Sequence, residues 1–445
     1  MAVRLILWSL FCLGVFAAPA LGAPLTLAEA MHLALKNNPG LKAAGTAVET
    51  AEADLAKARA RFLPQVNLGE TFSYSNNPSQ VFTYKLNQGR FTAQDFALPN
   101  LNFPRPYGNW RSQVSLNQPL FQGGQAYLGY QQARLGQEAA AAYVLSQRQR
   151  LLYQVTQAFF GLQLARERLG VMVQAKKTAQ AHLQIIESRH RAGEGLKADV
   201  LSAQVHLAQL TQEEMSATGQ VEIAKSALET VVGVKEVGSR ILAAAPQEPA
   251  PLPGRLAEIL SQAQEKRPDL KRLALTARVA QQEAAKARLN FLPKVRVVAE
   301  FDVDQRDLLG RGEDSYAVMA VMHFNLFNGL ADLARVRETR AQETQARELK
   351  RELENQIAHE VTSAAQELKV AHERLHVARA AAVQAREGLR LIRLRYGEGL
   401  TILVDLLSAE VALKNAELGQ VTALFETYLA QAGLELALGT LVGPR

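Results

Sequence analysis

Two segments of the chain alternate apolar and polar side chains with the period of two that predicts a β-strand. In the segment 65–75 the apolar face carries a single polar residue, Glu70. The segment 294–304 repeats the alternation, with its charged side chains confined to one face. Each segment has roughly the ten residues that a tilted strand needs to cross an outer membrane. Return strands are predicted over about 110–118 and 315–324.

A helical period dominates most of the remaining sequence. We expect two helical hairpins, 125–232 and 331–438, whose first arms end near residues 191 and 396 at turns marked by glycine. Neither first arm contains proline, and a helix of roughly 65 residues is near 100 Å long at 1.5 Å per residue. A helix of that length needs packing partners along its whole length. Ala, Leu, Val and Gln dominate the inner positions, which predicts close, coiled-coil packing.

The same order of elements occurs twice in the sequence. Phe62-Leu63-Pro64 recurs as Phe291-Leu292-Pro293 at a shift of 229, and Leu120-Phe121-Gln122-Gly123 recurs as Leu326-Phe327-Asn328-Gly329 at a shift of 206. The difference of 23 residues lies between about residue 70 and residue 115, in a segment rich in Asn, Pro, Gly and aromatic residues. Each half is therefore one copy of a supersecondary unit, with a variable loop inserted in the first.

The duplication predicts two structural repeats, 24–240 and 254–440, joined by a proline-rich linker, 241–253. The expected fold class is mainly α-helical with a membrane β-barrel portion, built from a repeated unit of two helices, two strands, a long helix and a returning helix. Four strands have two open edges that cannot face lipid, and natural membrane barrels begin at eight strands. A closed ring of several protomers would remove these edges.

The first residues, 1–23, predict a secretory signal peptide, because Arg4 precedes an apolar run that ends in small residues. The only cysteine, Cys12, lies within this segment, so the exported chain would hold no disulfide. No later stretch has the length and apolar character of a membrane-spanning helix. If the chain enters a membrane, we therefore expect it to do so as a β-barrel.

The formal net charge is +7 and is spread along the helices. A protein that binds nucleic acid would gather its positive charge in one patch, with aromatic residues for stacking. The sequence has no such cluster, and an exported protein rarely meets nucleic acid. We therefore expect no nucleic-acid partner and interpret the charge as a solvated helical face.

The whole arrangement resembles the TolC-type outer-membrane efflux protein family. The motifs that carry the resemblance are Phe-Leu-Pro before a strand, Leu-Phe-x-Gly before a very long helix, and a turn of the pattern Arg-(His/Tyr)-x-x-Gly, each present twice and in the family's order. The resemblance implies a homotrimer in the outer membrane of a Gram-negative-type bacterium, with a twelve-stranded barrel in lipid and a helical tunnel in the periplasm. It implies a passive exit duct rather than an enzyme, coupled to a periplasmic adaptor protein and an inner-membrane transporter.

The resemblance also implies roles for residues at the two turns. It assigns a periplasmic gate and neck to Asp199, Tyr396, Thr401 and Asp405, with Asp199 bonded to Tyr396 when the gate is closed. Thr401 stands where the family's best-known pattern has an arginine, and Ser408 where a second acidic ring can occur, so the gate here departs from that pattern. The residues that it places in contact with the adaptor are Arg189, Gly193, Leu196, Arg395, Gly399 and Leu400.

One motif points to a different chemistry. His372-Glu373-Arg374-Leu375-His376 satisfies the H-E-x-x-H pattern of zinc metalloproteases. In the first repeat, however, the equivalent residues are Arg166-Glu167-Arg168-Leu169-Gly170, so only Glu-Arg-Leu is shared. A third ligand is not recognisable downstream. We therefore expect a solvated helical face here, with no catalytic residue, no metal and no cofactor in the protein.

A second class of function is a periplasmic coiled-coil adaptor or scaffold without a membrane barrel. Adaptors also carry helical hairpins, but usually one hairpin inserted into a compact β domain. The alternating strands favour the channel. The sequence does not identify the cargo, because in such systems the specificity mostly belongs to the pump.

Overall fold

The computed structural model describes residues 24–243, 254–308 and 310–443. The predicted signal peptide and most of the predicted linker lie outside these residues. In chain order the first repeat holds α1 (Leu27–Asn37), α2 (Pro39–Ala60), β1 (Gln65–Ser75), α3 (Pro78–Asn87), α4 (Leu98–Asn102), β2 (Tyr107–Phe121), α5 (Gln125–Arg191) and α6 (Lys197–Val232). The second repeat holds α7 (Leu256–Lys266), α8 (Pro268–Arg288), β3 (Lys294–Gln305), β4 (Glu313–His323), α9 (Ala331–Gly397) and α10 (Leu403–Ala437).

The chain forms two compact units, and both combine segments from the two sequence repeats. Unit 1 comprises the described parts of residues 1–42, 147–267 and 357–445, and unit 2 comprises residues 43–146 and 268–356. The long helices α5 and α9 each contribute to both units. Neither repeat is therefore a compact domain by itself, which is expected when the helices of one copy bury their apolar faces against the other.

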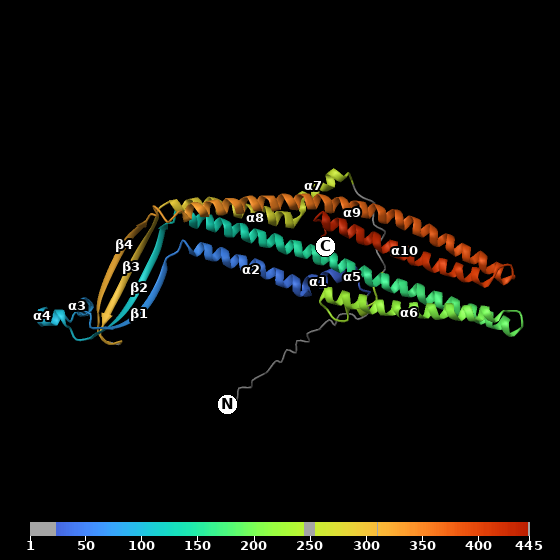
Figure 1. The fold of residues 1–445 in the computed structure, drawn as a ribbon, viewed down its shortest axis with the longest axis horizontal. Helices are drawn as coiled ribbons and strands as arrows, with labels where there is room; N and C mark the ends of the chain where they lie inside the picture. Colours follow the sequence, from blue (N-terminus) through green and yellow to red (C-terminus); the bar gives the residue numbers. More distant parts are fainter. Residues whose placement is uncertain (1–23, 244–253, 309, 444–445) are drawn as a thin grey trace, which may run out of the picture. The chain divides into compact units, whose positions relative to one another are not determined.

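In unit 2 the strands form one antiparallel sheet in the order β1-β2-β3-β4 (Figure 1). This arrangement confirms the predicted four strands, two from each repeat. Strand β2 is longer than predicted, because it starts at Tyr107 opposite Ser75 and continues beyond Pro119. The register shifts between Pro119 and Phe121, and this irregularity lets the strand accommodate a residue without an N–H donor.

The sheet has one apolar face and one polar face. On β1 the apolar side chains are exposed, with Leu68 at 77% and Tyr74 at 68%, and on β4 Tyr316 is 81% exposed. Glu70, the polar exception on this face, lies opposite Ser112, whose hydroxyl donates to Glu70 Oε2 at 2.5 Å. Large apolar side chains that face outward from a sheet indicate a surface that is covered in the working protein.

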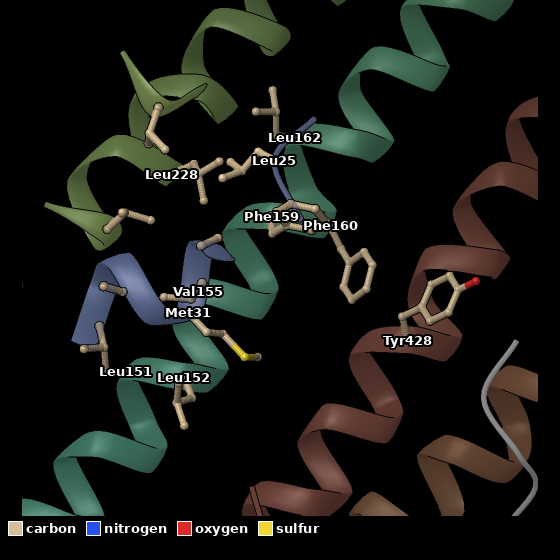
Figure 2. Close-up of a cluster of buried hydrophobic side chains, with 14 of the residues drawn as sticks. Leu25, Met31, Leu151, Leu152, Val155, Phe159, Phe160, Leu162, Leu228 and Tyr428 are labelled. Carbon is tan, nitrogen blue, oxygen red and sulfur yellow. The ribbon is translucent and has the colours of Figure 1, made fainter. Parts of the chain in front are cut away.

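The main core of unit 1 joins α1, α5, α6 and α10. Phe159 and Phe160 on α5 are almost fully buried, and the Phe160 ring stacks on Tyr428 of α10 with centroids 4.8 Å apart. Figure 2 shows this cluster, with Leu228 of α6 on the other side of α5. This core therefore ties the hairpin of the first repeat to the returning helix of the second.

The segment between β1 and β2 is more ordered than the predicted loop. It holds α3, a short 3-10 turn (Ala93–Phe96) and α4. Asn77 caps α3 by accepting hydrogen bonds from the N–H groups of Ser79 and Gln80, and Pro78 occupies the first helical turn. These are ordinary signals for a helix start. No helix in the described residues has both the length and the apolar character that a membrane span requires.

Candidate gate at the hairpin turns

The two hairpin turns have the same backbone geometry. In each turn an N–H donates to a carbonyl five residues earlier, at 2.9 Å in the first turn and 2.8 Å in the second: Glu194 to Arg189, and Leu400 to Arg395. Gly193 and Gly399 have positive φ angles of 82° and 76°. The shift of 206 residues therefore pairs these turns without a gap.

The positive φ predicts the effect of a substitution in the second turn. Replacing Gly399 by alanine should destabilise the turn by about 1 kcal/mol, because a Cβ atom disfavours left-handed backbone. No heavy atom lies within 4 Å of the position that the new Cβ would take, so strain is the expected cause. Gly397→Ala is the matched control, since Gly397 has equal space and ends a helix with ordinary φ. Equal thermal unfolding midpoints for the two variants would contradict the prediction.

A small apolar core lies behind the turns and draws on all four hairpin helices. It consists of Ile186 on α5, Val200 and Ala203 on α6, Leu389 on α9, and Leu403 and Leu406 on α10. Leu406 is 1% exposed and Leu403 is 3% exposed. The two hairpins thus pack against each other at this level, and the residues of the turns are presented on a packed base.

Arg189 connects the two hairpins at the turns. Its guanidinium donates to the Gly397 carbonyl at 3.2 Å and to the Tyr396 carbonyl at 3.5 Å, and it lies over the Tyr396 ring at 5.4 Å from the centroid. These carbonyls end α9, where a positive charge interacts favourably with the helix dipole. The resemblance assigned Arg189 to adaptor contact, whereas the structure brings it against the predicted gate residue Tyr396.

Asp199 lies near Tyr396, and the two have no direct hydrogen bond in the described part of the chain. Burial is the main cause that raises the pKa of the Tyr396 hydroxyl; the charge of Asp199 raises it further, and Arg189 opposes the effect. Arg189, Tyr396 and Asp199 therefore form one electrostatic group across the two hairpins. The closed-gate bond between Asp199 and Tyr396 remains a prediction.

The other two predicted neck residues contact each other. The Thr401 hydroxyl donates to Asp405 Oδ2 at 2.5 Å. Asp405 lies in the first turn of α10, where a carboxylate is favoured by the helix dipole, and it is exposed. Thr401, which stands in place of an arginine, therefore orients Asp405 without neutralising its charge.

The remaining predicted tip residues are exposed. Leu196 is 69% and Leu400 is 61% exposed, and next to them on the second turn Ile402 is 65% exposed. Arg395 is also exposed, and both positive-φ glycines face open space. The turns thus offer exposed apolar side chains in both repeats: Leu196 and its equivalent Ile402, which are related by the shift of 206, and Leu400, whose equivalent is Glu194.

A buried charged cluster that the sequence did not predict lies between the hairpins. Glu410 on α10 contacts His182 Nδ1 of α5 through Oε1, and its Oε2 lies 3.6 Å from His206 Nε2 of α6. Burial alone would raise the pKa of Glu410, but hydrogen bonding and charge from the two histidines lower it to about 2. A cavity of about 530 Å³ adjoins His206 and Glu410.

This cluster predicts a pH-dependent stability. Because the pKa of Glu410 is depressed from 4.5 to about 2, its contribution is present above pH 4.5 and is lost as the pH falls through about 2. At pH 5 Glu410→Gln should destabilise the hairpins by roughly 2 kcal/mol, because the neutral amide loses the charge interaction of the carboxylate with His182 and His206. Exposed Glu194→Gln is the control. Neighbouring ion pairs are the same in both proteins and should contribute equally to each: Lys414–Glu213, Lys176–Glu214, Arg386–Glu417 and Arg390–Glu387.

The measurement is the thermal unfolding midpoint of each purified protein at pH 5 and at pH 3. The difference in unfolding midpoint between wild type and Glu410→Gln should shrink at the lower pH, because protonation of Glu410 begins to remove the charge that stabilises the folded state. A difference that grows or stays constant toward pH 3 would contradict the assigned role of Glu410.

The histidines of the H-E-x-x-H motif lie on α9. Across the described residues, no three His, Cys, Asp or Glu side chains are arranged to hold a metal ion. In the Glu410 cluster the two imidazoles approach opposite oxygens of one carboxylate, which is the arrangement of a charge pair rather than of a set of metal ligands.

Comparison with known proteins agrees with the fold. The chain is 25% identical over 430 residues to the alkaline protease secretion protein AprF of Pseudomonas aeruginosa, which covers 94% of this chain and 85% of that protein. It is 28% identical over 346 residues to the protein CyaE of Bordetella pertussis, covering 73% of this chain and 67% of that protein. The solved structure of the Campylobacter jejuni CmeC outer membrane channel superposes with a TM-score of 0.79 at 17% identity, over 93% of this chain and 85% of the other.

The family described as "Outer membrane efflux protein" matches residues 30–234 and 259–440. The two matched ranges fall on the two sequence repeats, so the match covers most of both copies. It confirms the predicted outer-membrane channel family and location, and it favours transport over catalysis and over the periplasmic adaptor. This chain belongs to the outer membrane efflux protein family.

Proposed function

We propose that three copies of this chain form the exit duct of a tripartite efflux or type I secretion system. The duct itself is passive, and the energy comes from an inner-membrane transporter that reaches it through a periplasmic adaptor. The relative AprF is named as an alkaline protease secretion protein, which supports secretion, and the matching family is described as outer membrane efflux proteins, which supports efflux.

The observation that carries the proposal is the sheet of unit 2. Its apolar face is exposed, and its outer strands β1 and β4 have unpaired edges in the described chain. Lipid does not tolerate open strand edges, because unpaired backbone groups cannot be hydrated there. Three sheets of four strands each would close into a twelve-stranded barrel, with the apolar face toward lipid and the polar face toward the pore.

The proposed gate is formed by the hairpin turns. Arg189 holds the end of α9 to the first hairpin, and Asp199 lies close to Tyr396. Opening would release these contacts and move the α9–α10 hairpin outward, while the α5–α6 hairpin keeps its place. Three copies of Asp405 would form an acidic ring that favours cations in the neck.

The exposed turn residues are the proposed adaptor surface. Leu196 and Leu400 present exposed apolar side chains, one in each turn, and Arg395 adds an exposed charge. Binding at these residues would bias the gate toward the open state only if the adaptor prefers that state.

Membrane fractionation combined with planar-bilayer recording tests the proposal. The protein should sediment with the outer membrane, and detergent-purified protein should insert into a bilayer and give discrete, cation-preferring current steps. Recovery as a soluble periplasmic protein that gives no current would refute the proposed duct and restore the adaptor alternative.

A further inference from the structure

We propose that residues 76–106 form an exit cover, which docks on the pore-facing side of the sheet at the end where β2 begins and limits the size of what can leave the duct. This inference rests on the proposed function, because it takes the polar face of the sheet to line the pore. The exit cover is the segment that contains the 23 residues by which the first repeat exceeds the second.

The exit cover docks on the polar face and not on the apolar one. Asn87 Nδ2 donates to Asp304 Oδ2 of β3 at 3.2 Å, and Gln88 Nε2 donates to Asn109 Oδ1 of β2 at 2.6 Å. Asn109 and Asp304 both belong to the polar face: Asn109 lies opposite Ser73, and Asp304 lies opposite Arg111. The segment therefore lies against the polar face at the end of the sheet where β2 begins and β3 ends.

The docking contacts form a buried and connected network. Asp304 is 1%, Asn109 is 2% and Gln88 is 5% exposed. Asn109 Nδ2 donates to Asp304 Oδ1 at 2.5 Å, and Arg111 Nε donates to the same oxygen at 3.1 Å. Buried polar groups are costly unless they are satisfied, so such a network specifies one position for the segment. A loop that merely followed the strands to the outside would not need it.

The exit cover also has internal structure that makes it stiff. Lys85 donates to Asp95 at 2.5 Å across the segment, and this bond, together with bonds from Thr92, lowers the pKa of Asp95 to about 2. The rings of Phe82, Phe91 and Phe96 pack edge to face in succession, with centroid distances of 4.7 Å and 5.0 Å. A stiff segment restricts a pore more effectively than a flexible one, because it does not move aside for each passing molecule.

The second repeat contains no equivalent segment, since β3 ends at Gln305 and β4 begins at Glu313. One exit cover per chain gives three in the trimer, at one end of the strands. The duct would then have two constrictions in series, the gate at the hairpin turns and the three exit covers. The narrower of these two constrictions limits the ion current. The other one affects the current only after the narrower one has been widened.

The test uses the full-length trimer in planar bilayers, in two backgrounds. Replacing residues 78–106 by a short Gly-Ser turn should leave the conductance of the otherwise wild-type channel unchanged, because the gate still limits it. In an Arg189→Ala background, where the gate is opened, the same replacement should raise single-channel conductance by about twofold or more, since pore width then decides the current.

A milder variant guards against misfolding of the shortened loop. Asn87→Ala combined with Gln88→Ala keeps every strand residue and removes two docking contacts, so in the Arg189→Ala background it should increase brief high-conductance events. Leu98→Ala, at a side chain that is 72% exposed, is the matched control and should change nothing. Native gel mobility checks that each variant remains assembled.

The outcomes separate the two proposals. The exit cover is supported if the loop replacement and the Asn87→Ala, Gln88→Ala variant both increase conductance in the Arg189→Ala background. Neither variant should increase conductance in the otherwise wild-type channel. Assembled Arg189→Ala channels whose conductance is the same with and without residues 78–106 overturn the exit cover and leave the duct intact. Absence of channels in the unaltered protein overturns the proposed function itself.

Discussion

Arg189→Ala should raise the single-channel conductance of the purified protein by about threefold or more in planar bilayers. The substitution removes the two hydrogen bonds to the end of α9 and the contact with the Tyr396 ring. Losing a helix-end charge interaction and a cation–π contact costs about 1–2 kcal/mol per protomer. Three protomers share the proposed gate, so the closed state loses this stabilising free energy once in each protomer.

A matched control and a companion variant sharpen this prediction. Arg191→Ala removes a neighbouring arginine whose hydrogen bonds stay within α5, at Glu187 and Ser188, so it should leave conductance unchanged. Asp199→Ala should raise conductance less than Arg189→Ala, because the structure gives Asp199 only an electrostatic influence on Tyr396. Equal, wild-type conductance in Arg189→Ala and Arg191→Ala would refute the assigned role of Arg189.

Leu196→Asp combined with Leu400→Asp should abolish export while leaving the channel assembled in the outer membrane. Both side chains are more than half exposed, and neither belongs to the packed base of the turns. If they anchor the adaptor, losing two anchors at about 2 kcal/mol each lowers its affinity by about a thousandfold. Export is measured as cargo released by cells, and adaptor binding by cross-linking in the periplasm.

The control is Glu194→Gln combined with Glu398→Gln, which changes exposed polar residues in the same two turns. Those substitutions should leave export near the wild-type level, because they remove no apolar anchor. Normal export by the double aspartate variant would show that the leucines do not dock the adaptor.

The repetition in the sequence predicted much of the fold. The shift of 206 residues anticipated that Gly193 and Gly399 would occupy equivalent turns, and both glycines have positive φ. The alternation over 65–75 anticipated an exposed apolar face, and β1 presents one. These features depend on local periodicity and on turn chemistry, which neighbouring residues determine.

Contacts between helices were not predictable in the same way. Glu410 looks like any surface carboxylate of a helical period, yet it is held between His182 and His206. Its burial depends on the rotation and axial position of α10 against the α5–α6 hairpin, which lies far from α10 in the chain, and packing sets both. Arg189 likewise received its partner from the other hairpin.

The structure within the inserted segment was partly readable. Asn77 followed by Pro78 is a helix-start signal that could have indicated α3. Its docking was not readable, because Asn87 and Gln88 are as polar as any loop residues. Their partners Asp304 and Asn109 lie 217 and 21 residues away along the chain.

Native mass spectrometry of the protein extracted from the outer membrane measures how many copies assemble, and the barrel, the gate and the exit covers all require one closed ring. We expect a single dominant species with three times the mass of the mature chain, which persists in mild detergent at neutral pH. A monomer in that extract, or an assembly of any other copy number, would refute the proposed trimeric duct.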